Sequence, residues 1–275
     1  MNGNFFLPTY GTVLAAVAFL YFVVNTGLVS GVLSLLEGKP LAEARAEIAY
    51  AASFVEWFAE ETKRVYGDVI AAPQTDKRIL VFKEPVGVCA AITPWNFPIA
   101  IPCGGIAAAL SAGNTVIFKP SSDAILVGWL LCQCFWRAGV SKNTLQFLPC
   151  AGGSAGAQLA SHPDVDFVIL TGGTETGLKI LGARPDLPLT AETGGKNATV
   201  VTAMSDRDQA IADVVYSAFG NSGQKCSATS LLILEREIYD DEKFRRQLAD
   251  AAATFKAGSA WDFTAKMGPL IRPPR

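Results

Sequence analysis

The fold is decided by the stretch VGVCAAITPWNFPIAIPCGGIAAALSAGNTVIFKP, residues 86–120. Its apolar run at 86–92 predicts a strand, and the apolar residues 98–112 beyond a loop with two prolines predict a helix. A second strand is expected at 115–118. A strand, a helix and a strand in this order indicate two parallel strands joined by a helical crossover.

The same alternation continues toward the C-terminus. We expect further strands at 145–148 and 167–170, and helices at 123–138, 154–161 and 174–181. The predicted fold class is therefore α/β, with a Rossmann-like parallel sheet covered on both faces. Such sheets bind ligands at the carboxyl ends of their strands. The dinucleotide fingerprint GxGxxG opens none of these helices, so the motif gives no support for a standard Rossmann site.

Residues on either side of this region form further segments. Before the sheet we expect a helix at 42–63 and a strand at 76–83. From Ala198 the pattern changes, with strands at 198–201 and 230–235 and helices at 206–217 and 241–255. We therefore predict a first domain over 37–195 and a second over 196–275.

The first 36 residues carry no charge. Their apolar stretch within 5–36 is long enough to span a bilayer, which predicts a transmembrane helix and membrane contact. A buried helix, or an N-terminus mistranslated from a damaged gene, explains it equally well.

Composition excludes several functional classes. Half of the 275 residues are hydrophobic and 17% are charged, which indicates a filled core rather than disorder. The net charge of −2 and the absence of a basic run argue against nucleic acid as a partner. Six scattered cysteines without a CxxC pair, and a single histidine, favour neither a metal site nor a disulfide framework. Most of these cysteines are expected in the core of a reduced intracellular protein.

Two residues could carry nucleophilic chemistry. Cys226 lies among small residues in GNSGQKCS, and a cation at Lys225 would favour its thiolate. Glu192, in AETGGK, could activate water beside a glycine turn. Taken alone, a cysteine is usually a core residue and a glutamate usually lies on the surface.

Three other positions could contact a substrate or cofactor. The Asn96 amide could donate to an oxyanion, or it could bond its own backbone in a turn. Lys119 ends a predicted strand, where it could meet a ribose or phosphate, or it is an ordinary surface lysine. The run TGGT at 171–174 follows a strand and could cradle a phosphate or be a plain capped turn.

Together, five motifs resemble the signature of the aldehyde dehydrogenase superfamily. They are TPWNFP (93–98), FKPS (118–121), LTGGTETG (170–177), AETGGKNA (191–198) and SGQKCSA (222–228). The spacing of 34 residues from Glu192 to Cys226 also fits that family. The resemblance runs from about Leu33 to the C-terminus.

The resemblance implies the catalytic roles. Cys226 would attack an aldehyde, and the Asn96 amide with the Cys226 N–H would hold the oxyanion. Glu192 would activate the water that hydrolyses the resulting thioester to an acid. The subfamily motifs GKPLAEA (38–44), YAASFVEWFAEE (50–61) and EPVGVCAAITPWNFP (84–98) look like succinate-semialdehyde dehydrogenases. The stretches AETGGKNATVV (191–201) and SGQKCSA look closer to glutamate-semialdehyde dehydrogenases. A small carboxylated aldehyde is therefore the implied substrate, with succinate semialdehyde favoured.

The implied cofactor is NAD or NADP, and no metal. Lys119 would contact the adenosine ribose. Ser122 stands where NAD-preferring members often have a glutamate, so a 2′-phosphate is admissible. The remaining implied cofactor-binding residues are Ile92, Thr93, Pro94, Trp95, Gly152, Gly156, Thr171, Gly172, Gly173 and Thr193.

The resemblance also sets expectations for the whole protein. Family members continue past Arg275, with an E-x-F-G-P motif and a C-terminal oligomerisation strand, so the second domain is expected to be incomplete. The segment near 76–85 would supply another oligomerisation strand of a homo-oligomer, and the implied location is cytoplasmic. The alternatives are an inactive truncated remnant, membrane-tethered through its N-terminus, or a sequence from a broken gene.

Overall fold

The computed structural model describes residues 27–262 and 264–273. The chain divides into two compact units, one of residues 47–192 with the N-terminal residues up to 29, the other of residues 30–46 with 193–275. Residues 1–26 of the predicted membrane segment lie outside the described residues. Within the described part of the chain, no helix is long and apolar enough to cross a membrane.

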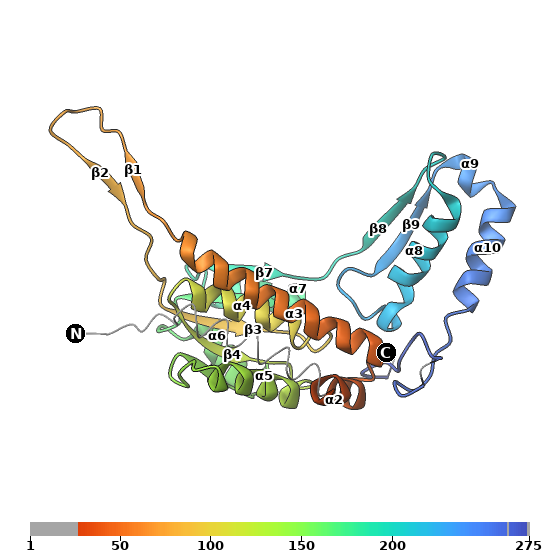
Figure 1. Ribbon diagram of the computed structural model, residues 1–275, viewed down its shortest axis with the longest axis horizontal. Coiled ribbons are helices and arrows are strands. Elements are labelled where there is room, and N and C mark those ends of the chain that lie inside the picture. Colours follow the sequence, from red (N-terminus) through yellow and green to blue (C-terminus); the bar gives the residue numbers. More distant parts are fainter. Residues whose placement is uncertain (1–26, 263, 274–275) are drawn as a thin grey trace. The chain divides into compact units, whose positions relative to one another are not determined.

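The first unit is built on a parallel sheet with the strand order β5–β4–β3–β6–β7 (Figure 1). These strands are β3 (Val88–Ile92), β4 (Thr115–Lys119), β5 (Leu145–Phe147), β6 (Phe167–Thr171) and β7 (Leu189–Glu192). The chain adds β4 and β5 on one side of β3, then returns to add β6 and β7 on the other. The predicted α/β fold with a parallel sheet is confirmed. No range was predicted for β7, because its short LTAE sequence is half polar.

One face of the sheet is covered by α4 (Ala100–Ser111) and α5 (Ile125–Arg137). Gly105 of α4 approaches Ile169, and Gly128 of α5 approaches Phe118. The absence of a side chain at these two glycines lets each helix lie close to the strands. The helix α4 is almost entirely buried, as an apolar sequence on all sides requires.

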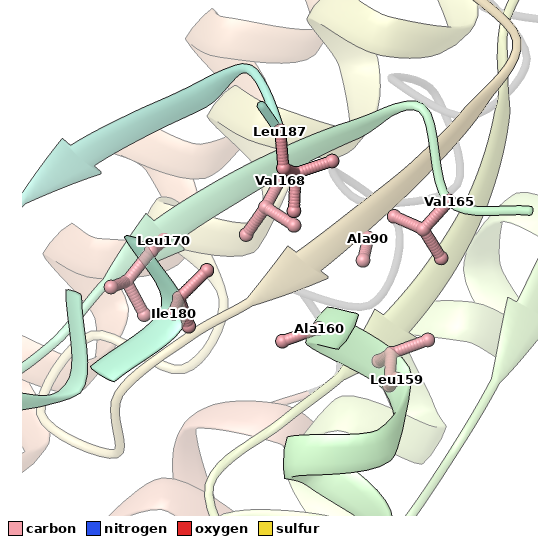
Figure 2. Packing of buried hydrophobic residues seen from close by; sticks show 8 residues of the cluster. All are labelled: Ala90, Leu159, Ala160, Val165, Val168, Leu170, Ile180 and Leu187. Atoms are coloured by element: carbon pink, nitrogen blue, oxygen red, sulfur yellow. The ribbon is translucent and has the colours of Figure 1, made fainter. Parts of the chain in front are cut away.

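The opposite face is covered by α6 (Ala155–Ser161) and α7 (Thr174–Ala183). Side chains from β3 and β6 pack there against both helices, as Figure 2 shows. This cluster consists of Ala90, Leu159, Ala160, Val165, Val168, Leu170, Ile180 and Leu187. Burial on both faces explains why the strands are continuous apolar runs rather than alternating ones.

Before the sheet come a long helix and a hairpin. The helix α3 (Leu41–Glu61) ends in the short 3₁₀ helix η1 (Thr62–Arg64), close to the expected bounds of 42–63. The antiparallel hairpin pairs β1 (Asp68–Ile70) with β2 (Ile79–Val81), and both strands are exposed along their whole length. The sequence predicted a strand at 76–83 but not β1, which has no buried face to give it a pattern. The role of this segment in oligomerisation stays a prediction.

The second unit contains a parallel pair of strands and several helices. The strands are β8 (Asn197–Val201) and β9 (Thr229–Leu234), and α8 (Arg207–Phe219) connects them through the 3₁₀ turn η2 (Gly220–Gly223). This unit also contains most of α2 (Leu28–Glu37), the start of α3, and the helices α9 (Arg236–Tyr239) and α10 (Glu242–Ala253). Its core consists of Val201, Ile211, Val214, Val215, Ile238 and Phe244.

Candidate active site

Most of the expected cofactor residues lie at the carboxyl edge of the five-stranded sheet. Thr93 follows β3, Lys119 ends β4, Thr171 ends β6 and Glu192 ends β7. The strand order reverses direction between β3 and β6, so the loops after these two strands diverge. Ligands of open α/β sheets bind at such a switch point. The fold therefore brings together, at one edge, residues that are up to 99 positions apart in the chain.

A buried hydroxyl at this edge has no hydrogen-bond partner in the described part of the chain. The Thr93 side chain is buried, and its Oγ1 meets no acceptor or donor among the described residues. Its backbone N–H donates to the Lys119 carbonyl at 3.2 Å, which fixes the start of the loop against β4. Because a buried polar atom without a partner is costly, this hydroxyl is suited to meet a bound polar ligand.

Lys119 is nearly fully buried, with 6% of its surface exposed. Its ammonium donates to the Pro120 carbonyl at 2.9 Å. Gly156, at the start of α6, lies against the lysine stem, since a Cβ there would be 3.0 Å from the lysine Cε. Lys119 is therefore not an ordinary surface lysine, and a side chain at position 156 would crowd its stem.

The loop that carries Asn96 is held by a carboxylate from another helix. Glu47 of α3 accepts hydrogen bonds from the N–H groups of Ile99, at 2.9 Å, and Ala100, at 3.2 Å. These groups begin α4, and its own N-cap residue gives no side-chain bond. Glu47 therefore caps the helix that follows Asn96, which anchors the loop three residues away.

Sequence reasoning missed Glu47. It is only 2% exposed, on the same side of α3 as the buried residues Ala44, Ile48 and Ala51. A charged residue within the apolar stripe of a helix was the signal that could have identified it.

The glycine run after β6 differs from the expected phosphate cradle. The N–H of Gly172 donates to the Glu192 carbonyl at 3.0 Å, so it extends the β6–β7 pairing. Gly173 is the N-cap residue of α7, and it gives no side-chain cap hydrogen bond. An anion at this turn would therefore meet the first amides of α7 rather than that of Gly172.

The remaining expected cofactor residues differ in exposure. Ser122, Gly152 and Gly173 are exposed, whereas Ile92, Pro94, Trp95 and Thr171 are half-buried. Glu192 is exposed at the end of β7, and Thr193 follows it as the first residue of the C-terminal segment of the second unit. Asn96 and Glu192 thus lie in the first unit, and Cys226 lies in the second.

Burial separates Cys226 from the other cysteines. Cys226 is exposed and Cys150 half-buried, while Cys89, Cys103, Cys132 and Cys134 are buried. Burial raises the pKa of Cys89 to about 11 and that of Cys132 to about 12, so both remain neutral thiols near pH 7. The expectation that most cysteines are core residues is confirmed. Cys226 has the accessibility that a nucleophile requires.

A strained turn precedes Cys226. Asn221, Ser222 and Gly223 all have positive φ, at 51°, 58° and 71°. For Ser222 this conformation costs about 1–2 kcal/mol, and for Asn221 it costs less, because asparagine enters the left-handed region more readily. The turn is held by the segment 268–271: the Ser222 hydroxyl donates to the Gly268 carbonyl, and the Gln224 side chain accepts from the Ile271 N–H at 2.9 Å.

Lys225 does not present an isolated cation beside the thiol. Its ammonium forms an ion pair with Glu43 at 2.8 Å, and both side chains are largely buried. It also lies 5.3 Å from the centre of the Tyr216 ring. The cation expected beside the thiol is thus paired with a carboxylate of α3.

Comparison with known proteins places this fold and these motifs in one family. Residues 22–275 match the model of the aldehyde dehydrogenase family. A succinate-semialdehyde dehydrogenase of Escherichia coli, named for NADP(+), is 40% identical over 87% of this chain and 50% of its own. A glutarate-semialdehyde dehydrogenase of Pseudomonas putida is 40% identical over 86% of this chain and 49% of its own.

A solved structure gives the same result. Betaine aldehyde dehydrogenase of Staphylococcus aureus, in complex with NAD+, has a TM-score of 0.91 at 29% identity. The match covers 96% of this chain and 52% of that one. The chain thus spans about half the length of the relatives it matches. Because the family model covers nearly the whole sequence, the chain belongs to the aldehyde dehydrogenase family.

Proposed function

We propose that this chain carries the cofactor-binding region and the nucleophile of an NAD(P)-dependent semialdehyde dehydrogenase. The observation that carries the proposal is Cys226, an exposed cysteine on a turn held by side-chain contacts, in a chain of this family. The reaction converts a small carboxylated aldehyde to the corresponding acid. Succinate semialdehyde is the favoured substrate and glutamate semialdehyde the next.

The residues at the carboxyl edge of the sheet fit a nicotinamide dinucleotide. The Thr93 hydroxyl offers a buried polar atom to a ligand, and Lys119 offers an ammonium at a strand end. The exposed Ser122 hydroxyl brings no negative charge that would repel a 2′-phosphate. Both NAD and NADP are therefore admissible. When bound, the cofactor supplies the acceptor for the hydride that the substrate loses.

Cys226 performs the covalent chemistry. Its thiolate adds to the aldehyde carbon, and the carbonyl oxygen becomes an oxyanion in a thiohemiacetal. The Asn96 amide and the Cys226 N–H donate hydrogen bonds to this oxygen, which stabilises the charge as it forms. Loss of hydride from the same carbon leaves a thioester on the sulfur.

Glu192 completes the turnover. Its carboxylate takes a proton from water, and the resulting hydroxide adds to the thioester carbon. Collapse of this adduct breaks the carbon–sulfur bond, which releases the carboxylic acid and returns the Cys226 thiolate. An exposed carboxylate at a strand end is accessible to water, as this role requires.

The substrate proposal is supported by the named relatives. The two at 40% identity are named for succinate and glutarate semialdehyde, which are both short aldehydes with a distant carboxylate. The subfamily motifs GKPLAEA and YAASFVEWFAEE favour succinate semialdehyde.

The test measures the formation of reduced cofactor through its absorbance. Succinate semialdehyde should give reduced cofactor with wild type, and Cys226→Ala should abolish it. Cys150→Ala is the matched control, because Cys150 is half-buried and lies outside the proposed chemistry. Wild type that binds cofactor but never reduces it would sink the catalytic proposal.

That outcome would favour the second candidate, a cofactor-binding module without turnover. The observation in its favour is that the polar groups of Thr93 and Lys119, at the carboxyl edge of the sheet, can meet a cofactor without any contribution from Cys226. Both candidates should bind the cofactor in calorimetry, but only the dehydrogenase should reduce it when the aldehyde is added.

A further inference from the structure

The peptide groups on both sides of Cys226 are held by hydrogen bonds. On the N-terminal side, the Lys225 carbonyl accepts from the Ala228 N–H at 3.2 Å. On the C-terminal side, the Cys226 carbonyl accepts from Nδ2 of Asn197 at 2.5 Å. A peptide group is planar, so fixing the Lys225 carbonyl also fixes the direction of the Cys226 N–H.

Both N–H groups of the Asn197 side-chain amide donate hydrogen bonds to this part of the backbone. Its second hydrogen bond goes to the Ala228 carbonyl at 3.0 Å. Both partners are carbonyls, so the amide must present its NH₂ group, which has two hydrogens to donate. An aspartate in the same place would present oxygen atoms to two carbonyls and could donate to neither while ionised.

The start of β8 explains how Asn197 reaches this position. Asn197 pairs with Thr229, whereas the next residue, Ala198, pairs with Leu231. The register therefore shifts between Asn197 and Ala198, as at a β-bulge. Bulges re-aim a side chain at the end of a strand, and here the Asn197 side chain binds the backbone of residues 226–228 instead of continuing the regular ladder.

We propose that Asn197 is a positioning residue for Cys226. By holding the Cys226 carbonyl it sets the rotation between the two peptide groups that flank the thiol. The sulfur and the Cys226 N–H then keep one relative orientation. This orientation matters because the aldehyde carbon is bound to the sulfur while its oxygen must meet the N–H donor. This inference rests on the proposed function, because the orientation matters for addition of an aldehyde.

A second observation separates this role from general stability. Asn197 is exposed and lies outside the apolar core of the second unit, so its replacement leaves that core intact. Thr199 provides a matched control on the same strand, since its hydroxyl pairs with that of Thr229 at 2.8 Å. Thr199→Val removes one hydrogen bond between the same two strands without touching Cys226.

The test uses the thiol itself. Iodoacetamide alkylates Cys226, the extent is read by mass spectrometry of its peptide, and Cys150 in the same sample is the reference. Succinate semialdehyde should protect Cys226 as the thiohemiacetal forms. We expect Asn197→Ala to weaken this protection by on the order of tenfold, and Asn197→Asp by more, because a misoriented donor loses much of its effect. Thr199→Val should protect as wild type does.

Hydrogen exchange at the Ala228 amide tests, independently of aldehyde binding, whether Asn197 holds the backbone around Cys226. Asn197→Ala should speed this exchange, and Thr199→Val should not. Equal exchange in the two variants would overturn the inference. Faster exchange with unchanged protection would leave Asn197 a structural residue only, which also overturns it. If aldehyde fails to protect wild type, the proposed function fails, and the positioning role fails with it. Exchange at Ala228 then still shows whether Asn197 holds the Cys226 backbone.

Discussion

Removing the Glu47 carboxylate should destabilise the first unit through the loop that carries Asn96. Glu47 accepts two backbone N–H bonds at the start of α4 while only 2% exposed. A hydrogen bond to a charged group contributes about 1.5–3 kcal/mol, and a buried donor left without a partner costs about 1–3 kcal/mol. We expect Glu47→Ala to lower the free energy of unfolding by about 3 kcal/mol.

The substitution Glu47→Gln separates charge from hydrogen bonding. A glutamine oxygen can still accept from the Ile99 N–H, but it lacks the negative charge that favours the start of a helix. We expect a loss of about 1–2 kcal/mol, smaller than that of Glu47→Ala. Glu56→Ala is the control, because Glu56 lies on the same helix and is exposed. Substitutions at such surface positions usually change stability by less than about 0.5 kcal/mol.

Urea unfolding followed by intrinsic fluorescence measures these differences, and thermal unfolding checks them. A loss of about 3 kcal/mol corresponds to a decrease of about 6–12 °C in Tm for a unit of this size. Exchange of the Ile99 and Ala100 amides should also become faster in Glu47→Ala. Equal stability of the Glu47→Ala and Glu56→Ala variants would refute the capping role.

Two further predictions concern the cofactor site and the buried thiols. Gly156→Ala should weaken NAD(P)+ binding measured by calorimetry, because the new Cβ would lie 3.0 Å from Cε of Lys119. Gly153→Ala is the control, since nothing lies within 4 Å of a Cβ at that position, and it should not weaken binding. Equal affinities of the two variants would contradict the contact between position 156 and Lys119. Burial raises the pKa of the Cys132 thiol to about 12, above the usual thiol pKa of about 8.5. Between these two pH values only the unfolded state releases the proton, so the free energy of unfolding should decrease as pH rises through this range. Urea unfolding at pH 8 and 10 should show a smaller decrease in Cys132→Ala, and an identical decrease would exclude this origin.

The sheet could be predicted because each of its central strands is a continuous apolar run. The strand expected at 115–118 is β4, and the one expected at 167–170 is β6, each within one residue. The helix α4 was predicted less accurately: it was expected at 98–112 and is observed as Ala100–Ser111. Its start depends on Glu47, which lies about fifty residues earlier in the chain, and no local pattern contains that contact.

The candidate site was predictable in its residue types but not in its contacts. Lys119 was expected at a strand end and is found there, yet its burial against Gly156 follows from packing of α6. The orphaned hydroxyl of Thr93 likewise depends on what surrounds it in three dimensions. Lys225 was read as a cation beside the thiol, because its partner Glu43 lies 182 residues away in the sequence.

The turn before Cys226 shows why a motif identifies a nucleophile more readily than it explains one. Asn221 and Ser222 adopt a left-handed conformation that neither residue prefers, so local preference works against the turn. The Ser222 and Gln224 contacts to residues 268–271 oppose that cost, and Asn197 fixes the backbone just beyond the thiol. All of these partners are distant in sequence from the glycine-rich motif that marks the cysteine. Substitutions at such distant partners should therefore alter the chemistry of Cys226 even where the motif itself is unchanged.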